Sequence, residues 1–255
     1  MVGSKAIYMK KYFLFSLLSA CVLSVQAQKQ DKPNPVGPSK IQSYSFTLAA
    51  GGGSFTTALG YQHLWQVGKK KKLGLGIGAR FTSAFGSNQY FTTAPAKLTS
   101  GKTGPGVLFA EDIEQNIDSV LFNRHQINAL NLSLHLHYRF APKWGAGFNI
   151  DALGFSFGGE QRGQYLGNNG IGAATTGKPT GFNVLLISDN DKGSLNSELF
   201  VDYALSKKWR AKLGYQYLFM EYTTRTEVQT TPDGQKNDRF RNKASGISLG
   251  LTYNF

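Results

Sequence analysis

Hydrophobic and polar residues alternate one by one over most of the chain after residue 40. The clearest stretch is the last one, 247–255, which reads Ile-Ser-Leu-Gly-Leu-Thr-Tyr-Asn-Phe. Successive side chains of a β-strand point to opposite faces, so this pattern predicts a strand with one apolar and one polar face. We expect a β-bulge to shift the alternation within 154–157. The same period predicts seven further strands, over 44–48, 59–67, 73–81, 130–140, 146–152, 195–205 and 211–219.

The segments between these strands alternate in length. The tight and basic links are 68–72, 141–143 and 206–208. The links on the other side are 51–57, which is short, and the long segments 86–125, 158–194 and 223–243. Short turns at one end and long loops at the other are typical of outer-membrane barrels, whose turns lie in the periplasm. We therefore predict an all-β fold, a closed antiparallel eight-stranded transmembrane β-barrel over 41–255, with ten strands as the alternative.

Residues 41–255 resemble the small eight-stranded outer-membrane barrels of the OmpA and OmpX type, and the outer-membrane β-barrel family common in Bacteroidota. The resemblance rests on the strand pattern and on the terminal Leu-Thr-Tyr-Asn-Phe. It implies that Tyr253 and Phe255 form a signal for the barrel-assembly machinery. It also implies the outer membrane of a Gram-negative bacterium as the location, with outer-membrane lipids and lipopolysaccharide as partners.

The three tryptophans test this interpretation. Trp65 lies just before the first tight link, and Trp144 and Trp209 directly follow the second and third. By strand parity all three fall on the apolar face, so they lie at one level of the barrel. We predict that Trp65, Trp144 and Trp209 form an aromatic girdle at the periplasmic membrane interface.

The N-terminus has the pattern of an export signal. From Met9 the chain reads Met-Lys-Lys, then an apolar run, then Val25-Gln26-Ala27 before Gln28. We predict a cleaved signal peptide over 1–27, starting at Met9, and a flexible periplasmic tether over 28–40. The alternative is lipidation at Cys21, which ends a lipobox-like Leu-Ser-Ala-Cys. Since Cys21 is the only cysteine of the chain, disulfide frameworks and Cys-ligated zinc are excluded from the mature protein.

The formal charge of +13 alone would suit nucleic acid or anionic lipid. Removing 1–27 takes away three lysines and no acid, so 25 basic residues remain against 15 acidic ones, or +10. The lysine run 69–72 falls in a predicted periplasmic turn, where anionic headgroups are the expected neighbours. We predict no nucleic-acid partner.

The inward face of the predicted strands is polar. Eight strands leave an interior that side chains nearly fill, which argues against a general porin, and we expect a largely plugged lumen. Hairpin arithmetic around Lys207 sets Asp202 opposite Lys212 and predicts an ion pair between them. The predicted polar network of the lumen consists of Arg80, His135, His137, Arg139, Asp151, Glu198, Asp202, Arg210 and Lys212.

Two chemical constellations arise from this inward face. Ser133, His135 and a carboxylate at Asp151 are the residue types of a lipid hydrolase. Side chains two apart on a strand are, however, about 6 to 7 Å apart, too far for direct proton transfer without long rotamers. His135, His137 and Asp151 are residue types that bind metals, but the sequence assures no third ligand. We predict no enzymatic activity, no cofactor and no metal.

The long loops then carry the expected function. Apolar positions within 110–121 share one helical face, which predicts a short helix over the barrel mouth. We predict a structural or surface-interaction protein that binds an extracellular ligand through these loops. A narrow channel or transporter for small or apolar solutes is the alternative, and a lipid-modifying enzyme is the third.

Overall fold

The computed structural model describes residues 39–167, 172–186, 188–225 and 229–255. The predicted signal peptide 1–27, with Met9 and Cys21, and nearly all of the tether 28–40 lie outside these residues. Within the described residues, no helix is long and apolar enough to cross a membrane. The long strands are β1 (Lys40–Gly51), β2 (Ser54–Val67), β3 (Leu73–Thr93), β4 (Ser119–Tyr138), β5 (Trp144–Phe157), β9 (Leu195–Ala204), β10 (Trp209–Thr224) and β13 (Arg239–Asn254).

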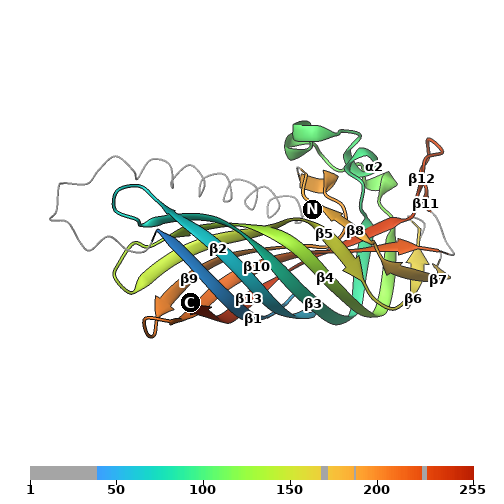
Figure 1. The fold of residues 1–255 in the computed structure, drawn as a ribbon. Coiled ribbons are helices and arrows are strands. Elements are labelled where there is room, and N and C mark those ends of the chain that lie inside the picture. Colours follow the sequence, from blue (N-terminus) through green and yellow to red (C-terminus); the bar gives the residue numbers. More distant parts are fainter. Residues whose placement is uncertain (1–38, 168–171, 187, 226–228) are drawn as a thin grey trace, which may run out of the picture. The chain divides into compact units, whose positions relative to one another are not determined.

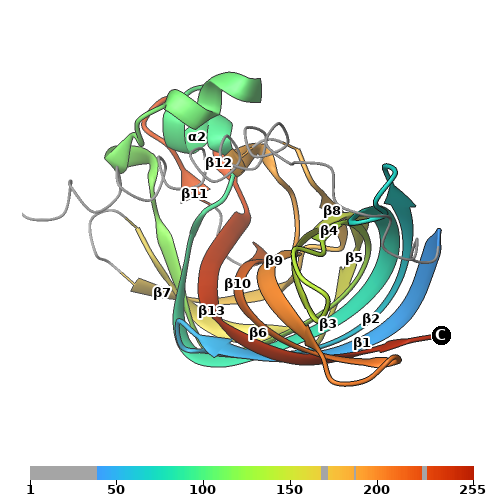
Figure 2. The same ribbon diagram turned by 90° about the vertical axis from the view of Figure 1, so that its left-hand side faces the viewer.

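These eight strands close into one antiparallel ring, which confirms the predicted fold and strand number. The hydrogen-bonded order is β1, β2, β3, β4, β5, β9, β10 and β13. The last strand returns to the first, with Tyr253 opposite Tyr44 and Ile247 opposite Ala50. Figure 2, viewed towards the turn end, shows the closed ring.

The period-two pattern forms strands because it gives the barrel an apolar outside and a polar inside. Leu134, Leu213 and Leu249 are about half exposed on the outer surface, whereas their strand neighbours Ser133 and Ser248 are buried inside. Each of the eight predicted strands corresponds to an observed one, although the predicted ranges extend past the ends of β4, β9 and β13 by one or two residues. Figure 1 shows the tight turns at one end of the barrel and α2, β11 and β12 at the other. We call these the turn end and the loop end.

The β-bulge lies earlier than predicted. Leu132 of β4 is opposite Leu153 of β5, but the next residue, Ser133, is opposite Asp151. Ala152 is therefore the extra residue, and no register shift falls in the predicted range 154–157. The bulge lets both Asp151 and Gly154 face inward, since both are buried.

The barrel continues beyond the eight-stranded ring as a smaller ring at the loop end. The β1–β2 turn is short, so beyond it β13 pairs directly with β3, with Phe240 opposite Thr93. On the other side, the hairpin of β6 (Gln161–Leu166) and β7 (Gly172–Pro179) pairs with β4 and β10. The loop-end ring thus runs through β3, β4, β6, β7, β10 and β13.

The remaining loop-end elements are short. The helix predicted within 110–121 is wrong: this segment holds only a 3-10 turn, and β4 begins at Ser119 because Val120 and Phe122 face the interior of the loop-end ring. The short loop-end elements are α2 (Ala96–Ser100), η2 (Gly104–Phe109), η3 (Glu114–Asn116), β8 (Phe182–Val184), η4 (Ser188–Asn190), β11 (Gln229–Thr230) and β12 (Lys236–Asn237).

Candidate functional site

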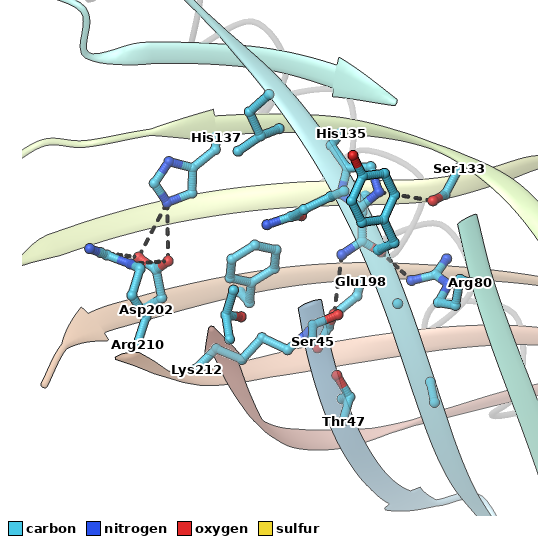
Figure 3. A pocket seen from close by; sticks show the side chains of 18 of the residues that line it. Ser45, Thr47, Arg80, Ser133, His135, His137, Glu198, Asp202, Arg210 and Lys212 are labelled. Atoms are coloured by element: carbon cyan, nitrogen blue, oxygen red, sulfur yellow. Dashed lines mark hydrogen bonds and ion pairs between the residues drawn. The ribbon is translucent and has the colours of Figure 1, made fainter. Parts of the chain in front are cut away.

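The candidate site is the polar interior of the eight-stranded ring. It holds charged side chains in three groups, which Figure 3 shows reaching into the lumen from different strands. Inward-facing glycines give these side chains room. A Cβ at Gly145 would lie 2.5 Å from Asp202 Oδ1 and 2.6 Å from His137 Nε2. A Cβ at Gly78 would lie 2.7 Å from His135 Nε2. Glycine at these inward positions therefore makes room for the charged network in a narrow barrel.

The first group lies nearest the turn end and centres on Asp202. The Arg210 guanidinium donates from Nε to Asp202 Oδ2 at 2.8 Å and from Nη2 to Asp202 Oδ1 at 2.7 Å. His137 Nε2 lies 3.1 Å from Oδ2 of the same carboxylate. One carboxylate thus joins β4, β9 and β10.

The second group is the ion pair of Lys212 and Glu198, with 2.5 Å between Nζ and Oε2. The Ser248 hydroxyl and the Asn149 amide also donate to this carboxylate, at 2.7 and 3.2 Å. The predicted register is correct, because Lys212 is opposite Asp202. The predicted ion pair between those two residues is wrong. The long Lys212 side chain extends to Glu198, and Asp202 forms its ion pair with Arg210.

The third group lies deepest and centres on Asp151, which is fully buried. Arg80 donates to its Oδ1 from Nη2 at 2.6 Å and from Nε at 2.9 Å. The Asn131 amide and the Asn196 backbone N–H donate to Oδ2, at 2.8 and 3.0 Å. The carboxylate is therefore fully engaged in the lumen wall.

Two further residues of the predicted network stand apart from these ion pairs. Arg139 lies at the turn end, and its guanidinium donates to the Lys71 carbonyl at 3.4 Å. His135 Nε2 lies 2.8 Å from the Ser133 hydroxyl. Their rotamers close the gap of about 6 to 7 Å expected between side chains two apart on a strand. Asp151 is opposite Ser133 but bonds Arg80, so the structure does not assemble a Ser-His-Asp triad.

The residues considered for a metal site are also held apart. His137 bonds Asp202, His135 bonds Ser133 and Asp151 bonds Arg80. Across the described part of the chain, no group of three or more His, Cys, Asp or Glu residues has the geometry to hold a metal ion.

A cavity of about 90 Å³ lies among these groups. Its lining runs from Ile41, Arg139 and Asn254 at the turn end to Thr56 and Gln216 farther in. One water needs about 10 to 15 Å³ of such space, so the cavity holds several waters but no wide channel. Thr56 Oγ1 donates to Gln216 Oε1 at 2.8 Å, which joins β2 and β10 across its inner end.

Beyond the cavity, an apolar core fills the lumen. Its aromatic rings come from facing walls: Tyr222 lies with its ring centroid 5.3 Å from that of Phe91 and 4.7 Å from that of Phe122. All three are fully buried. We call this cluster the loop-end core. It consists of Ala84, Phe91, Val120, Phe122, Ile127, Leu218, Met220, Tyr222, Phe240 and Ala244.

The loop-end core was not predicted, because most of its residues fall in the predicted loops or at the ends of the predicted strands. Val120 and Phe122 flank Leu121, so this segment is a short apolar run and gives no period-two signal. A further buried ionic group, which lies beside the core, was also not predicted. Glu221, fully buried, accepts from Arg241 at 2.8 Å and from Arg239 at 2.7 Å.

The three tryptophans lie beside the tight turns and on the outer surface, each more than 40% exposed. Trp144 is opposite Tyr203 and Trp209 is opposite Tyr253, with ring centroids 4.9 and 5.0 Å apart. Tyr253 and Phe255 lie at the β1–β13 seam, where the Phe255 N–H donates to the Gln42 carbonyl at 3.0 Å. The role of the tryptophans at a membrane interface and the role of Tyr253 and Phe255 in assembly stay predictions.

Comparisons with protein-family models and with curated proteins give no match. Among solved structures, the chain is similar to a major outer membrane protein of Thermus thermophilus, with 14% identity and a TM-score of 0.40 over 86% of this chain and 100% of that one. It is also similar to Neisserial surface protein A, with 11% identity and a TM-score of 0.34 over 85% and 96%. The chain is similar as well to the outer membrane protease OmpT of Escherichia coli, with 11% identity and a TM-score of 0.36 over 89% of this chain and 71% of that one.

Proposed function

We propose that this chain is an integral outer-membrane barrel with a closed lumen, and that its folded loop end binds a ligand outside the cell. The observation that carries the proposal is the loop-end core. Phe91, Phe122 and Tyr222 pack against one another across the interior and are fully buried. A solute that enters the polar cavity from the turn end would meet this core before it reached the loops.

The outer surface supports the membrane location. Large apolar side chains are exposed on every long strand, for example Leu59 at 57%, Leu132 at 59% and Leu249 at 62%. So much exposed apolar surface is stable only in contact with lipid or another apolar partner. The tryptophans beside the turns then lie at the level of one membrane interface.

The loop end supports the binding role. Its segments form a folded unit rather than separate loops: Asn190 donates to the Gly104 carbonyl at 3.2 Å, and Gln229 bonds both Thr93 and Asn116. The side chain of Phe109 projects from this unit with 84% exposure. A rigid surface with a projecting aromatic is suited to protein or glycan contact.

Two experiments test the proposal. In intact cells, a thiol reagent that cannot cross the membrane should label Lys102→Cys at the loop end and not Lys207→Cys in a tight turn. The native chain should show no conductance steps in planar bilayers. Labelling at Lys207→Cys alone would invert the proposed orientation, and steady conductance by the native chain would reject the closed lumen.

The second candidate is a narrow route for small solutes, which the polar cavity favours. The conductance measurement separates it from the first. The proposal includes no enzymatic cycle, because the carboxylate nearest the Ser133–His135 pair by register, Asp151, is bonded to Arg80. Mass spectrometry of lipid A from cells with and without the gene tests this point: a modification that depends on the gene would overturn it.

A further inference from the structure

Basic residues gather at every turn of the turn end. The β2–β3 turn carries a run of lysines, the β4–β5 and β9–β10 turns carry more, and β1 begins with another. Most of them are exposed, and Lys72 is half-buried. We call this set the lysine collar. It consists of Lys40, Lys69, Lys70, Lys72, Lys143, Lys207 and Lys208.

Acidic side chains are nearly absent from the same end. Among the described residues, the one side-chain carboxylate near the turns is Asp202, which faces the lumen and is bonded to Arg210 and His137. Asp151 and Glu198 lie deeper in the lumen, and the other described acidic residues lie at the loop end. The collar is therefore a ring of one charge sign around the rim of the barrel.

Aromatic contacts fix the height of the collar. Lys143 Nζ lies 5.8 Å from the ring centroid of Tyr203, which packs on Trp144. Lys208 Nζ lies 5.5 Å from the ring centroid of Tyr253 and donates to its hydroxyl at 3.2 Å. These rings face outward, so the ammonium groups lie at the outer rim rather than in the lumen. Lysines and aromatic rings combine in this way at a membrane interface.

We propose that the lysine collar binds the phosphates of anionic phospholipids in the leaflet that surrounds the turn end. The inference rests on the membrane location proposed above. Each lysine near an anionic membrane surface contributes about five-fold in binding. A ring of cations at every turn matches a ligand that surrounds the barrel, as lipid headgroups do, whereas a compact soluble polyanion would reach only one sector.

The test measures which lipids stay bound. The folded chain in detergent is given equal amounts of phosphatidylglycerol and phosphatidylcholine with the same acyl chains, and bound lipids are counted by native mass spectrometry. The native chain should retain phosphatidylglycerol with a preference of about five-fold or more. A collar variant with Lys69→Gln, Lys72→Gln, Lys207→Gln and Lys208→Gln, which leaves three collar lysines in place, should show a clearly smaller preference.

A loop-end variant removes the same number of charges as a control, through Lys97→Gln, Lys102→Gln, Lys178→Gln and Lys236→Gln. It should keep the native preference. The inference is overturned if the collar variant keeps that preference, if the control loses it equally, or if the native chain binds polyphosphate and shows no lipid preference. Refolding into pure phosphatidylcholine vesicles separates the two proposals: failure to fold there counts against the membrane barrel itself, whereas folding without a lipid preference rejects only the collar.

Discussion

Lys212 and Glu198 form an ion pair inside the barrel although they are not opposite each other in the sheet. Their Nζ and Oε2 atoms are 2.5 Å apart, while the residue opposite Lys212 is Asp202. Asp202 instead forms an ion pair with Arg210, which lies closer to the turn end. Neighbouring charges of β9 and β10 therefore pair diagonally, and the length of the lysine side chain makes this possible.

This arrangement predicts the outcome of two double-mutant cycles. Lys212→Met or Glu198→Gln alone should each cost about 3 to 5 kcal/mol of unfolding free energy, because a buried partner is left uncompensated. The double variant should cost less than the sum by about 1 to 3 kcal/mol. In the control cycle, Lys212→Met and Asp202→Asn should be additive within about 0.5 kcal/mol. Urea unfolding from liposomes measures both, and stronger coupling in the control cycle would mean that the observed pairing is wrong.

The inward glycines predict a steric effect on the same network. Gly145→Ala places a methyl group where Asp202 and His137 now lie, so we expect a loss of about 1 to 3 kcal/mol from overpacking. Gly181→Ala is the matched control, because no atom lies within 4 Å of the added carbon. Equal stability of the two variants in urea unfolding would show that the space beside Gly145 is not needed.

The outer surface predicts a dependence on membrane depth. Leu134→Arg or Leu213→Arg should cost about 2 to 4 kcal/mol, since both positions are expected near the middle of the membrane. Trp144→Arg and Trp209→Arg, at the expected interface, should cost about 0 to 1 kcal/mol from burial of the charge. The comparison is made by urea unfolding from liposomes, and the reverse order would refute the assigned depths.

Strand order and the β9–β10 register followed from the sequence because both depend on local features. A period of two over eight segments gives eight strands, and a tight turn near Lys207 fixes which residues of β9 and β10 are opposite. The partners of the lumen charges could not be predicted in this way. They depend on side-chain reach, as in the pair of Lys212 with Glu198 and the hydrogen bond between Ser133 and His135.

The loop-end core was missed for a different reason. Its residues come from four strands, β3, β4, β10 and β13, of a six-stranded ring. The alternation alone does not predict this ring, since β3 and β13 pair only where the β1–β2 hairpin ends. The bulge at Ala152 was also not predicted at its observed place, because it depends on the burial of Asp151 in the lumen. Both the loop-end core and the bulge depend on packing between residues far apart in the sequence. The pattern of a single strand carries no information about such packing.

The loop end predicts a pH effect on stability. Burial raises the pKa of Asp191, whose Oδ1 accepts from the Leu186 N–H at 2.6 Å. The native state therefore holds the proton more tightly than the unfolded chain, and stability falls as the pH rises through this raised pKa. Asp191→Asn keeps the acceptor and removes the charge, so we expect it to be more stable than the native chain at pH 7. The difference should disappear below the unfolded pKa of about 4.

Asp233 provides the matched control for this effect. Hydrogen bonds from Thr231 and Gln235 lower the pKa of the Asp233 carboxyl, so its contribution to stability is present above the unfolded pKa and is lost as the pH falls through the folded one. Asp233→Asn should therefore bring no gain at pH 7. Urea unfolding at pH 7 and at about pH 3, below the unfolded pKa, measures both variants. A gain in Asp233→Asn equal to that in Asp191→Asn at pH 7 would contradict the assignment.

The seam between β1 and β13 predicts how the barrel closes. Deleting 253–255 removes Tyr253 from its position opposite both Tyr44 and Trp209, together with the Phe255 ring, whose centroid is 5.0 Å from that of Tyr44. The freed backbone groups of β1 would then face lipid, where they find no hydrogen-bond partners. We expect this chain to fail to assemble and to lose its heat-modifiable migration on gels.

Deletion of 232–234 removes the same number of residues from the exposed turn between β11 and β12, and it should leave both assembly and migration unchanged. If the chain without 253–255 still gave a heat-modifiable band, the pairs from Ser45–Thr252 to Ala50–Ile247 would suffice to close the ring. Tyr253 and Phe255 would then act in recognition by the assembly machinery alone. Refolding of the purified chain in detergent distinguishes these roles, because that machinery is absent there and only a loss of seam contacts would prevent closure.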